Sequence, residues 1–297
     1  MRIAFWSEQK KAGTAFNLAS VASAAVCLHP LSAAVVSGGY HDKKLERKFF
    51  QDIRVPKIGT TGKGLGQEPV QQTMFAAQES EQPPMLAAET QEYFLLTGLD
   101  CLLAKDRRED LTEEVVKANM RQVVKDRLYY LPASARQEYE WWHRDCRFVR
   151  MNRVMEAVES YFDIVFIDCG SRQDDYARKL FREADVCVLN MNQRTEVIGQ
   201  YYSNPPKLRG EVFFLLGRYF ANDLYNRENL QRIYRVEGER LGAIPYNPYL
   251  HAAEQAGKMK NGIKSCIGAG REERRTEFEK ELVRTTNLIL KLAGLVS

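Results

Sequence analysis

Apolar runs alternate with amphipathic stretches along most of the chain. The runs predict buried strands, because strands covered on both faces are apolar throughout; they lie at residues 2–6, 33–37, 162–170, 184–192, 210–219 and 238–247. The stretches predict helices; they lie at 13–29, 149–161, 174–183, 193–203, 226–236, 248–258 and 271–295. This alternation favours a doubly wound α/β fold, with a mainly parallel sheet of about seven strands and helices on both faces.

The pattern is weaker between the second apolar run and the middle of the chain. Residues 40–92 have no clear period, so we predict one α/β domain over 1–297 that carries a long insertion or loop at about 40–92. The glycine-rich GTTGKGLG (59–66) lacks phosphate-loop spacing and favours a flexible loop. Further on, Asp110 stands three residues before Glu113, as in a capping box, and 127–134 predicts a strand.

Composition narrows the class of protein. The 297 residues are 44% hydrophobic and 28% charged, which is typical of a soluble chain with a full core. The net charge of +4 is too small to indicate nucleic-acid binding by itself. Six scattered cysteines and four histidines show no zinc-ligand spacing, which favours reduced thiols in the cytoplasm. No apolar run reaches the length of about 18 residues that a membrane span needs.

Three predicted strand ends carry residues that could hold a ligand, because open α/β sheets bind ligands at the carboxyl ends of their strands. The first end leads into FWSEQKKAGTAFNLASVAS (5–23), where many α/β proteins have a phosphate-binding loop. The second is Asp168 in DIVFIDCGS, a carboxylate that could hold a magnesium-bound water. The third is AIPYNP, with Pro245.

These pieces together resemble the MinD/ParA group of P-loop ATPases (SIMIBI class) over most of the chain outside 40–92. TAFNLASVAS resembles the helix after that group's phosphate loop, and YFDIVFIDCGS resembles its Walker B strand. EADVCVLNMNQRTEVI and LGAIPYNPYLHAAEQAG resemble its next strand and its closing motif. GLDCLLA and RLYYLPAS resemble in particular the TadZ/CpaE branch, which serves Flp (Tad) pilus assembly.

The phosphate loop departs from the group's KGGVGKTT. In an ungapped alignment Lys11 falls on the phosphate-binding lysine and Trp6 on the signature lysine that crosses the dimer interface. Three side chains replace the glycines; they are Ser7, Glu8 and Lys10. Side chains there narrow the cradle that backbone N–H groups form around phosphate. Ala12 replaces the hydroxyl that binds magnesium, and Gly13 follows it, so the nearest hydroxyl is Thr14.

Two further positions differ from the resemblance. Gly39 stands where the group has the acidic residue that activates water, and Gly217 where it has the asparagine that reads adenine. We therefore expect a site that no longer hydrolyses ATP. A remaining site would bind ATP or ADP with magnesium weakly or not at all, with Asp168 reaching the metal through water. Its residues would be Lys10, Lys11, Ala12, Gly13, Thr14, Asp168 and Pro245. The phosphate-loop helix should begin near Ala12.

Simpler interpretations stay open for several of these residues. Lys10 and Lys11 could be solvated lysines, and Asp168 could satisfy loop amides. Trp141 and Trp142 could form an exposed interaction spot or fill the core. The C-terminal LILKLAGLVS (288–297) has one lysine, so packing on the sheet is favoured over a membrane-surface helix.

The resemblance implies two functions. The favoured one is a cytoplasmic scaffold with a degraded nucleotide site, which forms a homodimer and recruits proteins of a pilus or secretion assembly, through which it could reach the membrane. The alternative is a working ATPase that positions DNA or a protein complex. Direct DNA binding is not favoured.

Overall fold

The computed structural model describes residues 1–8, 12–38, 44–50, 98–105, 109–134, 144–170, 175–193, 196–268 and 275–296. Only 44–50 of the predicted insertion are among them, so the single-domain arrangement over 1–297 stays a prediction. The loop at 59–66, Gly39, Trp141 and Trp142 also lie outside the described residues.

The sheet has eight strands in the order β3-β4-β2-β5-β1-β6-β7-β8. Every neighbouring pair is parallel except β3 and β4, which are antiparallel. The mainly parallel sheet predicted from the apolar runs is therefore confirmed. The strands are β1 (Arg2–Trp6), β2 (Ala33–Ser37), β3 (Arg121–Val124), β4 (Leu128–Leu131), β5 (Ile164–Gly170), β6 (Val186–Met191), β7 (Glu211–Tyr219) and β8 (Leu241–Pro245).

Strand β3 was not predicted from the sequence. Its four residues, RQVV, are mostly exposed or half-buried, because β3 is an edge strand of the sheet. A short strand with a polar start has neither the continuous apolar run nor the alternation that indicates a strand. The neighbouring β4 is buried throughout and lies inside the predicted range 127–134.

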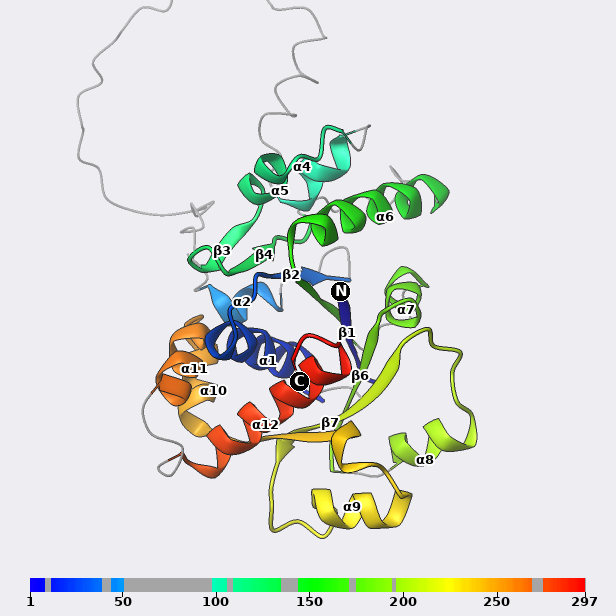
Figure 1. Cartoon of the computed structure of the whole chain (residues 1–297), viewed down its shortest axis with the longest axis vertical. Coiled ribbons are helices and arrows are strands. Elements are labelled where there is room, and N and C mark those ends of the chain that lie inside the picture. Colours follow the sequence, from blue (N-terminus) through cyan, green and yellow to red (C-terminus); the bar gives the residue numbers. More distant parts are fainter. Residues whose placement is uncertain are drawn as a thin grey trace, which may run out of the picture. The chain divides into compact units, whose positions relative to one another are not determined.

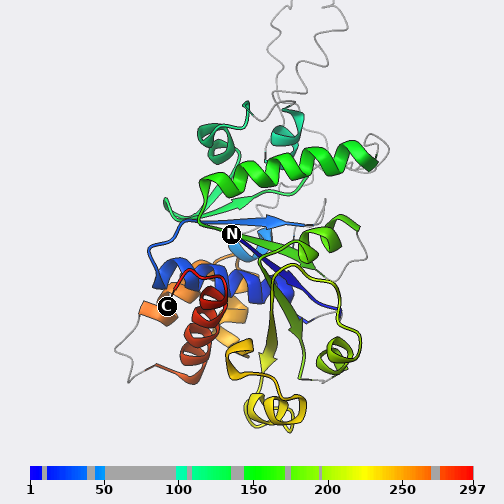
Figure 2. The ribbon, with the colours of Figure 1, turned by 45° about the vertical axis from the view of Figure 1, so that its right-hand side comes forward.

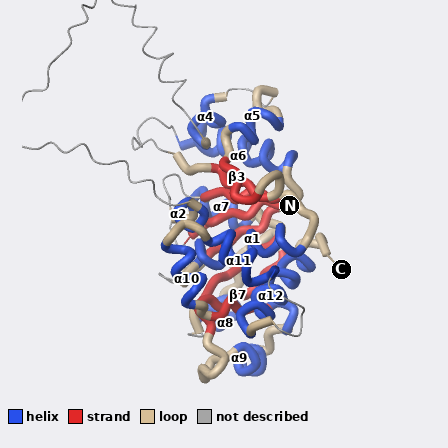
Figure 3. Tube along the Cα trace, turned by 90° about the vertical axis from the view of Figure 1, so that its left-hand side faces the viewer, coloured by secondary structure: helices blue, strands red, loops and turns tan. Residues whose placement is uncertain are grey.

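One layer of helices covers the face of the sheet formed by Ile3, Phe5, Val35 and Phe166. Figure 1 shows α1, α10, α11 and α12 gathered on this side, and Figure 3 shows them in front of the strands. The layer consists of α1 (Thr14–Leu28), α2 (Glu46–Phe49), α10 (Pro248–Gln255), α11 (Met259–Gly268) and α12 (Glu277–Leu292). The small residues of α1 let it pack closely: Ala19, Ala22 and Ala25 are fully buried.

A second layer covers the opposite face, where Ala4, Val36 and Ile167 point. Figure 2 shows the long α6 along one part of this layer and α7 beside it. The layer consists of α4 (Leu99–Ala104), α5 (Glu113–Ala118), α6 (Arg144–Tyr161), α7 (Asp175–Arg182), α8 (Glu196–Ser203) and α9 (Arg227–Tyr234). A short 3-10 turn, η1 (Gly238–Arg240), precedes β8. Helices on both faces confirm the doubly wound arrangement.

The predicted cap of α5 is wrong. Thr112, not Asp110, is the N-cap residue, and its side chain accepts a hydrogen bond from the Val115 N–H at 3.4 Å. Threonine at this position satisfies one of the N–H groups that a helix start leaves unpaired. A complete capping box occurs instead at α12, where Thr276 and Glu279 bond each other's backbone N–H groups.

Helix α12 packs on the sheet, as the sequence predicted, and covers an edge. β8 is the last strand of the sheet, so one side of it has no neighbouring strand. There the Thr285 hydroxyl donates to the Ala243 carbonyl at 2.9 Å and accepts from the Ala243 N–H at 3.0 Å. Ile289 and Leu290 of this helix are fully buried. In the part of the chain that the structure describes, every helix is too short or too polar for a membrane span.

The neighbouring threonines Thr285 and Thr286 allow a matched test of this edge. Thr285→Val should lower the free energy of unfolding by about 1–3 kcal/mol, because it leaves a buried N–H and a buried carbonyl without partners. The Thr286 hydroxyl is buried and finds no hydrogen-bond partner in the described part of the chain. Thr286→Val should therefore leave stability unchanged or raise it. Urea unfolding of both variants measures the difference, and equal losses would contradict the proposed edge contact.

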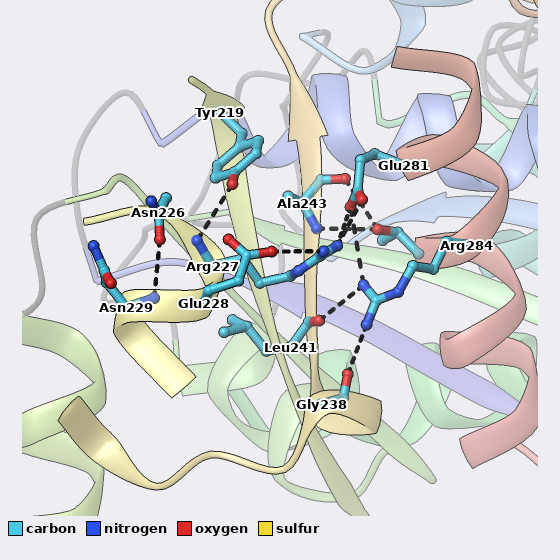
Figure 4. Close-up of polar contacts among 11 residues, drawn as sticks. Tyr219, Asn226, Arg227, Glu228, Asn229, Gly238, Leu241, Ala243, Glu281 and Arg284 are labelled. Carbon is cyan, nitrogen blue, oxygen red and sulfur yellow. Dashed lines mark hydrogen bonds and ion pairs between the residues drawn. The ribbon is translucent and has the colours of Figure 1, made fainter. Parts of the chain in front are cut away.

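A polar network fixes α9 and α12 to the end of the sheet (Figure 4). Arg227 of α9 donates from Nη1 to both carboxylate oxygens of Glu281, each at 2.6 Å. Its Nη2 reaches Glu228 at 2.9 Å, and its backbone N–H donates to the Tyr219 hydroxyl at 3.3 Å. Arg284 donates to the backbone carbonyl of Gly238 at 2.9 Å. The network therefore joins α9, α12, β7 and the turn before β8.

The electrostatics of this network follow from burial and pairing. Burial by itself would lower the pKa of Arg227, yet the hydrogen bonds and charge of Glu281 raise it above its ordinary value. A backbone hydrogen bond, together with Arg227, lowers the pKa of Glu228. Burial raises the pKa of Tyr219, which keeps its hydroxyl protonated. The lowered pKa of Glu228 keeps that carboxylate charged beside Arg227.

Candidate functional site

A cleft of about 330 Å³ opens where the first strand meets α1. Its volume is in the range of small-molecule sites. β1 lies between β5 and β6, the point where the strand order reverses, which is the usual ligand site of an open α/β sheet. The described site residues predicted from the sequence all line it: Ala12, Gly13, Thr14, Asp168 and Pro245. Lys10 and Lys11 lie outside the described residues.

Helix α1 begins later than the sequence predicted. The first helical residue is Thr14, and Gly13 before it has a left-handed backbone with φ 78° and ψ 23°. This conformation suits glycine and ends any helical continuation toward Ala12. The predicted start near Ala12 is therefore wrong by two residues. The N–H groups of the first turn lack intrahelical acceptors and no side chain caps them, so the helix presents a positive dipole end to the cleft.

Asp168 stands at the end of β5, between Phe5 of β1 and Ser37 of β2 in the register of the sheet. Its side chain is 6% exposed, and one carboxylate oxygen accepts from the Gly170 N–H at 2.9 Å. Gly170 has a positive φ of 62°, and its carbonyl accepts from the Ser7 N–H. The carboxylate thus holds the turn after β5 and also lines the cleft.

Magnesium does not fit the described residues of this cleft well. Hard cations prefer several oxygen ligands, but Ala12 and Gly13 carry no side-chain oxygen and Asp168 already accepts a hydrogen bond. Thr14, the first residue of α1, lines the cleft and carries the hydroxyl nearest to the loop. No cluster of three or more acidic, histidine or cysteine ligands occurs among the residues that the structure describes.

Gly217 of β7 lies against the loop before α1. A Cβ atom added to it would stand 2.6 Å from the Ala12 carbonyl oxygen and 2.7 Å from the Asn17 amide nitrogen. Both distances are too short for real contacts, and the first partner is backbone. A side chain at Gly217, including an asparagine that could read a base, therefore needs the loop to move.

A buried amide chain connects α1 to the sheet. The Asn17 Nδ2 donates to Asn190 Oδ1 at 2.9 Å, and Asn190 Nδ2 in turn donates to the Trp6 carbonyl at 3.3 Å. Asn17 is 1% exposed and lines the cleft, and its Oδ1 has no hydrogen-bond partner among the residues that the structure describes. A buried acceptor without a donor is rare in native proteins, and Asn17 Oδ1 is such an acceptor at the cleft wall.

The far wall of the cleft is cationic and aromatic. Arg218 follows Gly217 at a register shift between β7 and β8, and its φ of 51° is left-handed. Its side chain is exposed and makes no ion pair with any residue that the structure describes. Tyr246, next to Pro245, stacks on Phe220 with ring centroids 6.0 Å apart. Bulges often redirect a side chain beside a functional site, and Arg218 is placed in this way.

A second group of polar residues in the cleft is centred on Glu254. Lys48 of α2 bonds Glu254 of α10, and His251 bonds the other oxygen of the same carboxylate at 2.9 Å. Gln255 bonds the second ring nitrogen of His251 at 3.2 Å. The charge of Lys48 offsets that of Glu254, so Glu254 repels an anionic ligand less than a free carboxylate would.

Trp6 and Glu8 face away from this cleft. Trp6 is partly buried and packs on Phe181 with ring centroids 5.8 Å apart. Trp6 and Glu8 border a second hollow between α7 and α8, near Arg178 and Tyr201. Glu8 is exposed and borders this second hollow. The narrowing of the phosphate cradle by Glu8 and Lys10 stays a prediction, because residues 9–11 lie outside the described residues.

Sequence reasoning missed three participants at this site: Asn17, Arg218 and the Lys48–Glu254 pair. Asn17 looked like one polar residue in a helix of small residues. Arg218 could have been suspected from its place one residue after Gly217 at a strand end. Lys48 and Glu254 are 206 residues apart, and no local pattern connects them.

Comparison with known proteins finds similarity at the level of the fold. No family model and no curated protein matches the sequence. Among solved structures, a ParA family ATPase from Chlorobium tepidum TLS matches with a TM-score of 0.57 and 12% identity, covering 96% of this chain and 97% of its own. The septum site-determining protein MinD of Pyrococcus horikoshii OT3, complexed with Mg-ADP, matches at 0.59 and 13%, covering 99% and 98%.

MinD in a MinC:MinD cell division protein complex from Aquifex aeolicus matches at 0.57 and 14%, covering 99% of this chain and 95% of its own. At these identities the similarity shows the fold and nothing finer. The chain has the α/β fold of the MinD and ParA P-loop ATPases.

Proposed function

We propose that this protein is a MinD/ParA-like scaffold whose nucleotide site no longer supports ATP hydrolysis. The observation that carries the proposal is the start of α1, where Ala12 and Gly13 precede the helix without a hydroxyl for magnesium. The packing of Gly217 against the Ala12 carbonyl supports it, because the loop occupies the space of a base-reading side chain. The fold is retained, whereas the magnesium-binding hydroxyl and the base-reading asparagine of the resemblance are replaced by Ala12 and Gly217.

The replaced residues should affect the rate of ATP hydrolysis more than they affect nucleotide binding. Phosphoryl transfer depends on positioning and on stabilising charge, and each such contact is typically worth about 2–4 kcal/mol of barrier. The resemblance also places Trp6 at the signature lysine and Gly39 at the water-activating acid. Binding is less sensitive, because the dipole end of α1 and Lys11 remain. We therefore propose weak or absent binding of ATP or ADP with magnesium, with contacts from Lys10, Lys11, Thr14, Asp168 and Pro245.

The proposed role is localisation or assembly. The aligned MinD structures include one in a complex with MinC, which is a precedent for partner binding by this fold. We propose that the chain forms a homodimer that does not depend on ATP and recruits proteins of a Flp (Tad) pilus or secretion assembly, as the resemblance to the TadZ/CpaE branch implies. Pilus genes beside its own gene would support this, and a partition operon would contradict it.

Two measurements test the loss of hydrolysis together. The full chain should release phosphate from ATP at the background rate, and Lys11→Ala should leave that rate unchanged. Light scattering should give the same dimer mass with and without ATP and magnesium. Hydrolysis that Lys11→Ala abolishes, or a dimer that forms only with ATP, would instead support the alternative, a working ATPase that positions DNA or a protein complex.

A further inference from the structure

The second hollow, between α7 and α8, has a volume of about 750 Å³ and lies on the face of the sheet opposite α1. Its floor is apolar, because Phe181 of α7, Leu189 of β6 and Val197 of α8 line it and are buried. Trp6 of β1 is half-buried and packs on the Phe181 ring. We call this hollow the α7–α8 groove. Apolar surface rimmed by polar residues is typical of a protein interaction site.

One wall of the groove carries two arginines of α7. Arg178 and Arg182 are four residues apart, so they lie on the same side of the helix, and both line the groove. Arg178 is half-buried and Arg182 is exposed. Among the residues that the structure describes, neither guanidinium forms an ion pair with a carboxylate. Both arginines are therefore available to a carboxylate from outside the chain.

The carboxylates near this wall do not offset its charge. Glu183 pairs with Lys179 and Asp185 pairs with Arg209, each at 3.9 Å. Glu8 is the one carboxylate among the described residues that line the groove. It follows β1 and so lies at the carboxyl edge of the sheet, whereas α7 runs back toward the opposite edge, because it connects the parallel strands β5 and β6. The wall formed by α7 is thus positively charged.

The opposite wall, on α8, offers neutral hydrogen-bond donors. Tyr201 packs edge-on against Phe214, with ring centroids 5.3 Å apart. Burial raises the pKa of Tyr201, which keeps its hydroxyl protonated and able to donate. The amide side chains of Gln200 and Asn204 are exposed beside it and also line the groove. A ligand with acceptor oxygens on both flanks and an apolar centre matches these walls.

The topology of the sheet favours a helical ligand over an extended one. The floor strand β6 is paired with β1 on one side and β7 on the other, so a peptide cannot add to it as a further strand. A helix bonds its own backbone groups and can place an apolar face on a closed floor. Each wall is an eight-residue helix, which corresponds to about 12 Å, or two turns of a docked helix.

From these observations we propose that the α7–α8 groove binds an acidic amphipathic helix of a partner protein. The inference rests on the proposed function, a scaffold that recruits proteins, and it names the surface and the kind of partner. Apolar residues at positions i, i+3 or i+4, and i+7 of the partner would cover the groove floor. Acidic residues four apart would match Arg178 and Arg182, which are about 6 Å apart along the axis of α7, and arginine pairs well with carboxylates.

Trp6 allows binding to be followed at the groove itself. The chain has three tryptophans, so replacing Trp141 and Trp142 by phenylalanine leaves Trp6 as the one fluorescent indole. The probes are two synthetic 18-residue peptides with leucine on one helical face and either glutamate or lysine on its flanks. The glutamate peptide should shield Trp6 from quenching by acrylamide and should bind roughly 5- to 30-fold more tightly than the lysine peptide.

Three results of this titration would overturn the proposal. They are equal affinity for the two peptides, tighter binding of the lysine peptide, and a Trp6 signal that neither peptide changes. Phenylbutyrate, a small apolar carboxylate, is titrated beside them. If it shields Trp6 while neither peptide does, the groove is a small-molecule site and the proposed helix is refuted.

Variants of the arginines test the charge contribution. Arg178→Gln and Arg182→Gln should each weaken binding of the glutamate peptide by roughly 2- to 5-fold, and the double change to glutamate should reverse the preference between the peptides. Lys179→Gln is the matched control, because Lys179 lies on the same helix and does not line the groove. It should leave both affinities unchanged. A preference that survives the double charge reversal would contradict the assignment.

The peptide titrations contain no nucleotide, so they are independent of the test of hydrolysis. Turnover of ATP would contradict the non-hydrolysing scaffold and leave the groove assignment intact. Failure of the glutamate peptide to bind would refute the groove assignment and leave the proposed loss of hydrolysis as it stands.

Discussion

Arg227→Ala is expected to lower the free energy of unfolding by about 2–3 kcal/mol, because it removes the charged hydrogen-bond partner of a half-buried carboxylate; this is more than an exposed pair costs and less than a fully buried one. The side chains of Arg227 and Glu281 are 18% and 15% exposed, and the guanidinium bonds both carboxylate oxygens. Removing the guanidinium leaves the half-buried Glu281 carboxylate between α9 and α12 without its bidentate partner. It also releases the first turn of α9, whose carboxylate Glu228 loses its partner.

Matched variants show whether the loss of stability comes from the ion pair itself. Glu281→Ala should cost as much as Arg227→Ala, and the double replacement by methionine should cost far less than the sum, because no buried charge remains. The control is the exposed pair of Lys179 in α7 and Glu183 just after this helix, with atoms 3.9 Å apart, where Lys179→Ala should cost less than about 1 kcal/mol. Urea unfolding at neutral pH measures all four. Additive losses for Arg227 and Glu281 would show that the pair is not coupled.

Gly217→Ala is expected to lower the free energy of unfolding by about 3 kcal/mol, near the upper end for overpacking. The new methyl group would stand 2.6 Å from the Ala12 carbonyl and 2.7 Å from Asn17 Nδ2. A backbone carbonyl cannot turn aside as a flexible side chain can, so the loop before α1 must shift. The cost should therefore appear together with faster hydrogen exchange at the start of α1.

Gly199→Ala in α8 is the control for this substitution. Its added Cβ would lie 3.4 Å from the Tyr234 ring, an ordinary contact. Alanine in a helix interior is favoured over glycine by about 0.5–1 kcal/mol, so this variant should be more stable than the parent. If Gly217→Ala behaved like Gly199→Ala, the loop would be free to yield, and the absence of an asparagine at 217 would need another explanation.

The structure connects two positions at which the chain departs from the MinD/ParA resemblance, Gly217 and the altered phosphate loop. From the sequence, Gly217 was a lost base-reading residue, independent of the altered loop ten residues into the chain. In the structure the two belong together, because β7 and the Ala12 carbonyl touch. Restoring only the asparagine should therefore damage the fold before it restores a base contact.

Several features followed from the sequence because they depend on local chemistry. The apolar runs around Ile3, Val35, Phe166 and Val188 become the central strands, since an uninterrupted apolar segment has to be covered on both faces. Asp168 at a strand end and Pro245 after the last strand could be placed on one edge of the sheet, because parallel strands end together. Five of the predicted site residues consequently line one cleft.

Other features were decided by the tertiary structure. Local pattern missed the start of α1 at Thr14, because the left-handed Gly13 depends on the loop that packs on β7. The Arg218 backbone is left-handed because β7 and β8 shift register there. Lys48 and Glu254 meet across α2 and α10 only when the chain has folded. Strands and helices repeat over a few residues and leave a periodic signal in the sequence, whereas these contacts join segments up to 206 residues apart and leave none.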